Sequence, residues 1–183
     1  MGHFALTGWL LDLIVKTPGS RVVNVSSLAH KQGHMDFDNL LYEGAKGYSR
    51  IGAYSRSKLA NLLFTYELQR FFEGNSLESI AIAAHPGLSN TNLFRHLEKY
   101  WMIRQLSPLF TRFTQGADAG ALPEIRAAVD PEVKGGEYYG PDGFREMKGF
   151  PVLVQSNKAS HSREDARKLW EVSEKLTGVR FRV

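Results

Sequence analysis

A tyrosine and a lysine stand four residues apart in the segment "AYSRSKLAN", at Tyr54 and Lys58. If this segment is helical, that spacing places both side chains on one face of the helix. A tyrosine hydroxyl has an unperturbed pKa of about 10, which makes it a poor base at neutral pH. A neighbouring ammonium group favours the phenolate and can lower such a pKa by roughly 1–3 units. The pair can therefore be a proton donor and acceptor, although the same spacing also occurs on ordinary amphipathic helices.

Two short apolar segments place further polar groups near this pair. The segment "RVVNVSS", residues 21–27, is rich in valine, which is typical of a strand buried on both faces. It ends in Ser27, whose hydroxyl can hydrogen-bond a carbonyl oxygen. The segment "SIAIAAHPG" predicts a second strand over residues 79–84, closed by Pro86 and Gly87.

The remaining helices and strands that would position these residues are predicted from the spacing of apolar residues and from cap and turn residues. Apolar spacing predicts helices over residues 2–16, 53–72 and 116–129, and a last helix between a Ser162 N-cap and Gly178. A final short strand is expected within residues 134–143. Alternating strands and helices favour an α/β fold with a parallel sheet, in one domain of residues 1–183. Ligands bind such sheets at the carboxyl ends of the strands, which puts Ser27 and residues 85–91 and 139–143 on one rim.

The composition and charge of the chain indicate which kinds of site and partner to expect. The 183 residues carry a net charge of +4 and contain no cysteine, so disulfides and thiolate metal sites are excluded. Lys and Arg are scattered rather than clustered, and no nucleic-acid partner is expected. The first apolar run is interrupted by Asp12 and is too short to cross a bilayer, so no transmembrane segment is expected. The lack of cysteine fits a reducing compartment, and a cytoplasmic location is expected. His30 and His34 have the spacing of metal ligands, but they flank Gly33 in a polar loop, and no metal site is expected.

The strand-end serine, the Tyr-x-x-x-Lys pair and the Pro-Gly turn occur in a characteristic order. Together they resemble the short-chain dehydrogenase/reductase family, over essentially the whole chain. The segments "GHFALTG", "RVVNVSSLAH", "AYSRSKLANLLFTYEL" and "AAHPGLSNTNL" resemble its retinol-dehydrogenase-like branch. The residues that match the family's motifs are Ser27, Tyr54, Lys58, Pro86, Gly87 and Thr91.

The resemblance implies a role for each of these residues. Tyr54 would be the general acid/base and would also contact the cofactor, and Ser27 would polarise the substrate carbonyl. Lys58 would favour the phenolate and bind the nicotinamide ribose. Thr91, with the backbone after Pro86, would contact the nicotinamide carboxamide.

The resemblance also implies a reaction and its partners. The branch interconverts carbonyls and alcohols on small lipophilic aldehydes, ketones or alcohols, and it uses NADP or NAD. NADP is slightly favoured here. The aromatic and apolar residues of segment 91–114 would form a flap over the substrate.

One part of the family pattern is missing. None of the 17 glycines forms the glycine-rich turn that lets the backbone approach a dinucleotide pyrophosphate. The chain therefore resembles the C-terminal half of the enzyme, with an incomplete NAD(P)-binding domain and a partial Rossmann-type, doubly wound parallel sheet. The strand at residues 21–26 would then be an exposed edge, leaving Val22, Val23 and Val25 uncovered.

Other interpretations stay open. The main alternative is a truncated, catalytically inactive binding or dimerisation module derived from this family, with a homodimer as its assembly. A serine hydrolase using Ser27 and His85 lacks the G-x-S-x-G turn that such enzymes need. A nucleic-acid binder would require strongly salt-dependent binding.

Overall fold

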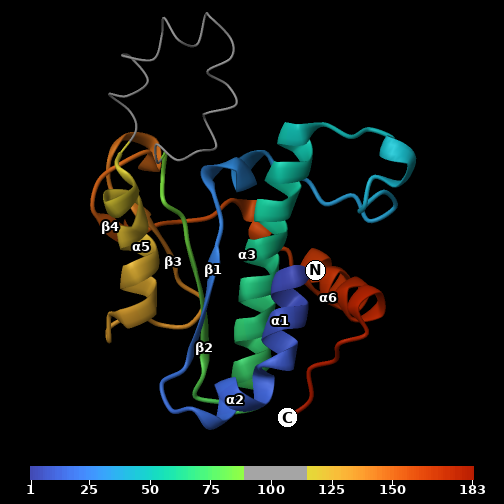
Figure 1. Cartoon of the computed structure of the whole chain (residues 1–183), viewed down its shortest axis with the longest axis horizontal. Coiled ribbons are helices and arrows are strands. Elements are labelled where there is room, and N and C mark those ends of the chain that lie inside the picture. The colour runs from blue at the N-terminus through green and yellow to red at the C-terminus, as the bar shows by residue number, and fades with distance from the viewer. Residues whose placement is uncertain (89–114) are drawn as a thin grey trace, which may run out of the picture.

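The computed structural model describes residues 1–88 and 115–183. Four strands form one sheet in the order β1-β2-β3-β4 (Figure 1). The first three strands are parallel and β4 is antiparallel to β3, which confirms the predicted α/β fold with a partial Rossmann-type sheet. The helices and strands, in chain order, are α1 Gly2–Trp9, α2 Leu11–Lys16, β1 Arg21–Val25, α3 Arg50–Gly74, β2 Ile80–Ala84, α5 Ala117–Val129, β3 Tyr138–Pro141, β4 Pro151–Leu153 and α6 Arg163–Thr177.

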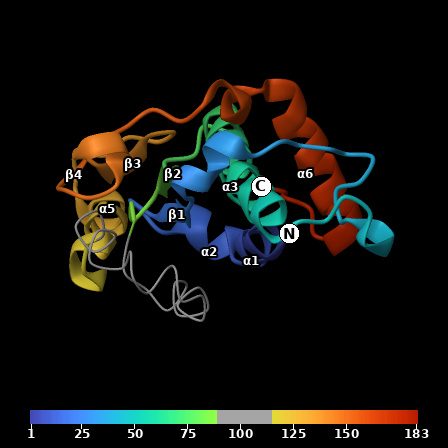
Figure 2. The ribbon, with the colours of Figure 1, turned by 90° about the horizontal axis from the view of Figure 1, so that it is seen from above.

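The central strand β2 is covered on both faces. Ala81 and Ala83 pack against α3, whereas Ile82 and Ala84 pack against α5. A strand in this position needs apolar residues throughout rather than an alternating pattern, which is why "IAIAA" contains no polar residue. Figure 2, which views the molecule from above, shows α5 on one side of the strands and α3 with α6 on the other.

The helix that carries the predicted pair begins at a serine N-cap. The Ser49 hydroxyl accepts a hydrogen bond from the Gly52 amide at 3.0 Å, so α3 begins three residues before the predicted Ala53. The last helix confirms its predicted caps. Ser162 accepts from the Asp165 amide at 3.1 Å, and Gly178 follows with a φ of +70°.

Two predicted elements differ from the structure. The single helix expected over residues 2–16 is interrupted at Leu10, whose ψ of 0° separates α1 from α2. The strand β4 was not predicted, because three residues are too few to show a period. Its first residue, Pro151, lacks an N–H, and proline in a sheet is confined to edge positions of this kind.

Strand β1 lies at one end of the sheet and has an uncovered edge. Across the described ranges no strand pairs with its outer side, as the sequence predicted. Val25 is 39% exposed, but Val22 and Val23 are half-buried because helices cover both faces of the strand. Beside it, α1 and α2 expose an apolar stripe consisting of Leu6, Trp9, Leu10 and Leu13. In the described parts of the chain, no helix is both long and apolar enough to span a membrane.

Candidate active site

The predicted pair lies near the start of α3. The Lys58 ammonium is 5.6 Å from the centre of the Tyr54 ring, which confirms that the two side chains share a face. Tyr54 is 39% exposed, and its hydroxyl forms no hydrogen bond with any described residue. The phenol is therefore accessible to a ligand.

Lys58 joins α3 to the end of β1. Its Nζ donates to the Val25 carbonyl at 3.2 Å, and Asn61 Nδ2 donates to the same oxygen at 2.9 Å. In return, the Ser26 hydroxyl donates to the Lys58 carbonyl at 3.0 Å. Burial lowers the pKa of Lys58, and the negative charge of Glu124 on α5 opposes that shift.

Ser27 follows β1 and begins the 3₁₀ turn Leu28–Gln32. Its Oγ accepts from the Ala29 amide at 3.2 Å, which leaves the hydroxyl hydrogen free to donate to a bound carbonyl. The Ser27 carbonyl is 2.6 Å from His30 Nδ1, and His30 Nε2 accepts from the Asn157 amide at 3.3 Å. These partners place the imidazole hydrogen on Nδ1, and burial lowers the pKa of His30. Neither ring nitrogen of His30 is left for a metal.

The Pro-Gly turn follows β2, the neighbour of β1. Gly87 has a φ of +66°, and a Cβ there would lie 2.3 Å from the Met147 carbonyl oxygen, so only glycine fits. The Leu88 amide donates to that same oxygen at 2.6 Å. Gln115, just before α5, donates from Nε2 to the Pro86 carbonyl at 2.9 Å. The turn is thus attached to the connection between β3 and β4 and to the start of α5.

The carboxyl ends of β1 and β2 therefore bring together most of the predicted site residues. We call this region the strand-end rim, formed by Ser27, Lys58, Pro86 and Gly87; it lies at the top of the sheet in Figure 1. Tyr54 lies one turn before Lys58 on α3. Thr91 and the predicted flap 91–114 lie outside the described residues.

The hydrolase interpretation fails on geometry. His85 Nε2 is 3.2 Å from Glu146 Oε2, and His85 Nδ1 accepts from the Gly87 amide at 3.2 Å. Both imidazole nitrogens are therefore engaged by groups other than Ser27. Sequence spacing did not predict Glu146, because this carboxylate comes from a turn 61 residues beyond His85.

Nearly the whole chain is similar to known proteins. The chain is 38% identical over 182 residues to human retinol dehydrogenase 14, covering 98% of this chain and 50% of that protein. It is 34% identical over 186 residues to human polyprenol dehydrogenase, covering 98% of this chain and 52% of that protein. A crystal structure of an uncharacterized protein from Mycobacterium paratuberculosis superposes with a TM-score of 0.77 at 36% identity, over 100% of this chain and 57% of that one.

A scan against protein-family models found no match. The chain spans about half the length of the curated relatives it matches. Over that length, the chain is a homologue of the retinol dehydrogenases and is related through them to the short-chain dehydrogenase/reductase family.

Proposed function

We propose that this chain carries the catalytic half of an NAD(P)-dependent oxidoreductase that interconverts a carbonyl and an alcohol on a small lipophilic molecule. The observation that carries the proposal is the placement of the Lys58 ammonium. It lies beside the accessible Tyr54 ring and is bonded to the end of β1, two residues before Ser27. The names of the relatives, retinol and polyprenol dehydrogenases, favour a lipophilic alcohol or aldehyde as substrate.

The strand-end rim fits the nicotinamide end of a dinucleotide. The Pro86–Gly87 turn has a fixed backbone geometry, because Gly87 packs against the Met147 carbonyl at a positive φ and Gln115 holds the Pro86 carbonyl. Lys58 supplies a positive charge and hydrogen-bond donors for the ribose hydroxyls. NADP or NAD, when bound, supplies or accepts the hydride. A glycine-rich turn for the pyrophosphate is not among the motifs of these 183 residues.

The protein's own side chains would handle the proton and the substrate oxygen. Ser27 donates its free hydroxyl hydrogen to the carbonyl oxygen and orients it. Tyr54 gives a proton to that oxygen during reduction and takes one from the alcohol during oxidation. Lys58 places its ammonium beside the ring that carries this hydroxyl.

The test is a fluorescence titration of the purified chain with NADPH and NADH, followed by turnover of a retinoid aldehyde. Tyr54→Phe should still bind the dinucleotide but lose at least about a hundredfold in kcat, because the proton transfer is removed. A Tyr54→Phe variant that turns over at the wild-type rate would refute the proposed role of the phenol.

A second candidate rests on a different observation. The uncovered edge of β1 and the apolar stripe on α1 and α2 suit a catalytically inactive binding or dimerisation module. If the chain folds and self-associates but binds neither NADPH nor NADH, the result would favour this second function over the first.

A further inference from the structure

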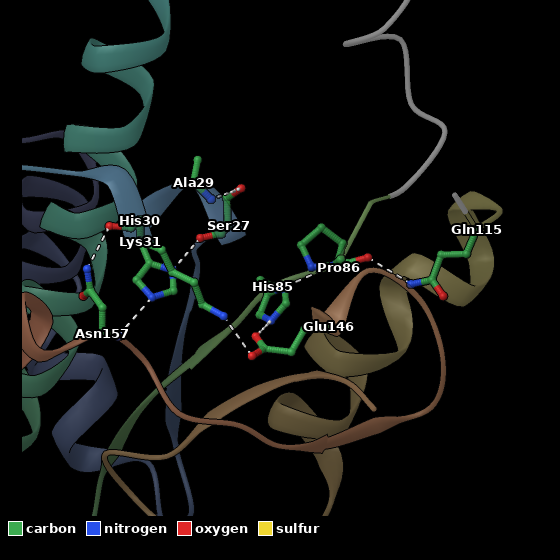
Figure 3. A network of polar contacts seen from close by, with 10 residues as sticks. Ser27, Ala29, His30, Lys31, His85, Pro86, Gln115, Glu146 and Asn157 are labelled. Atoms are coloured by element: carbon green, nitrogen blue, oxygen red, sulfur yellow. Dashed lines mark hydrogen bonds and ion pairs between the residues drawn. The ribbon is translucent and has the colours of Figure 1, made fainter. Parts of the chain in front are cut away.

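Glu146 connects the segments that follow the three parallel strands. Its Oε1 is 2.9 Å from the Lys31 ammonium, in the 3₁₀ turn after β1. Its Oε2 is 3.2 Å from Nε2 of His85, directly after β2. Glu146 itself lies in the 3₁₀ turn Phe144–Glu146 after β3. Figure 3 shows its carboxylate between the Lys31 ammonium and the His85 imidazole.

The backbone around Glu146 is held in an unfavourable conformation. Arg145 and Glu146 have φ values of +52° and +59°, which L residues other than glycine, Asn and Asp adopt rarely. Such conformations persist only where surrounding contacts enforce them. The contacts of the Glu146 carboxylate are among those that do so here.

His85 connects Glu146 to the Pro-Gly turn. Its side chain is fully buried and lies over Gly140 of β3, where an added Cβ would be 2.1 Å from His85 Nε2. Nδ1 accepts from the Gly87 amide, so the imidazole hydrogen is on Nε2 and points at Glu146. A carboxylate at residue 146 thereby selects the tautomer that can receive the Gly87 N–H.

Next to the same turn, Leu88 is hydrogen-bonded to Gln115. The Gln115 amide donates to the Leu88 carbonyl at 3.0 Å, so residues 89–114 connect two positions that are hydrogen-bonded to each other. The Gln115 side chain bridges the Pro86 carbonyl and the Gly149 amide, at 2.9 and 3.0 Å. The contacts of Glu146 therefore lie between the core of the sheet and the base of that segment.

We infer that Glu146, through His85 and Lys31, is a positioning residue that holds the Pro86–Gly87 turn in the geometry that receives the nicotinamide end of the dinucleotide. The inference rests on the proposed function for the identity of the ligand. The claim that Glu146, 59 residues beyond Gly87, fixes the geometry of the turn does not depend on which ligand binds there.

The test compares the wild-type chain with Glu146→Gln, which keeps the shape of the side chain and removes its charge. The dissociation constant for NADPH should rise about tenfold, since a misplaced turn loses roughly one hydrogen bond to the ligand. Amide hydrogen exchange should accelerate at Gly87 and Leu88 and stay unchanged in α3. The nitrogen chemical shifts of His85 should indicate a fixed Nε2–H tautomer in the wild type and a mixture in the variant, with His30 as an internal Nδ1–H reference.

Two further variants separate the outcomes. Lys31 is exposed, so Lys31→Gln should not disturb the fold. This variant should change the NADPH affinity, the amide exchange and the His85 tautomer in the same direction as Glu146→Gln, but by a smaller factor. Glu132→Gln, an exposed carboxylate just past α5, should shift none of them. Unchanged exchange at Gly87 together with an unchanged His85 tautomer in a folded Glu146→Gln would overturn the inference. If the wild type binds no dinucleotide, the proposed function fails, and the exchange and tautomer data still decide whether Glu146 positions the turn.

Discussion

The ammonium of Lys58 and the carboxylate of Glu146 show which polar contacts a sequence can reveal. The Tyr54–Lys58 pair is local, because residues at i and i+4 on a helix must be neighbours. Its contact was therefore predictable from the sequence. The contacts of Glu146 with Lys31 and His85 span 115 and 61 residues, and no periodicity relates such positions. They exist because the ends of three strands meet at one rim, which only the assembled sheet defines.

Glu146 also makes a pH-dependent contribution to stability. The hydrogen bond from His85 and the neighbouring Lys31 charge lower its pKa from 4.5 to about 2. Between these two values the unfolded chain binds a proton at this residue and the folded chain does not. The free energy of unfolding should therefore fall as the pH drops from about 4.5 towards 2.

The measurement is urea unfolding at a series of pH values for the wild type and Glu146→Gln. Groups that do not interact with Glu146 contribute equally to both chains and cancel in the difference, whereas His30, whose pKa the Glu146 charge raises, does not cancel fully. The wild type should lose stability more steeply on acidification below about pH 4.5. Parallel curves for the two proteins would contradict the contacts assigned to Glu146.

At the scale of elements, the sequence predicted what local signals specify. The valine-rich and alanine-rich strands, the long α3 and the Ser162 cap of α6 all follow from patterns within a few residues. The break at Leu10 and the short β4 do not, because leucine is a good helix former and three residues are too few to show a period. Gly140 belongs to the second group: nothing near it in the sequence explains why a glycine stands in a strand, and His85 provides the reason.

Replacing Gly140 with alanine should therefore destabilise the protein by on the order of 1–3 kcal/mol, the usual cost of overpacking a core. His85 cannot move aside easily, because it is fully buried and both of its ring nitrogens are engaged. Glycine within a strand is intrinsically worse than alanine, so any loss must come from the contact with the imidazole. Chemical denaturation measures the change.

A matched control is Gly74→Ala at the end of α3, where an added Cβ meets nothing within 4 Å. It should leave stability unchanged or raise it by up to about 1 kcal/mol. A Gly140→Ala variant as stable as Gly74→Ala would mean that the space above Gly140 is not needed for the imidazole.

At the scale of the whole molecule, the two edge strands of the sheet differ. The antiparallel β4 has only three residues and begins with a proline, so it offers a poor edge for pairing with another strand. At the opposite end β1 presents unpaired backbone groups, and the adjoining α1 and α2 present Trp9 and Leu13 with 73% and 67% of their surfaces exposed. Unpaired strand edges and exposed apolar patches both promote association.

The chain purified alone should therefore self-associate through this side, with a sedimentation coefficient that rises with concentration. The double variant Trp9→Ser, Leu13→Glu should shift it towards the monomer, because it removes apolar surface and adds a charge that is costly to bury. Phe150→Ser is the control, since Phe150 is 74% exposed but lies just before β4, at the opposite edge of the sheet. If Phe150→Ser disrupts association as strongly as the double variant, contact is nonspecific and the open side of the sheet is not the interface. If only the double variant does so, the edge of β1 and its apolar stripe form the surface at which this chain meets another polypeptide.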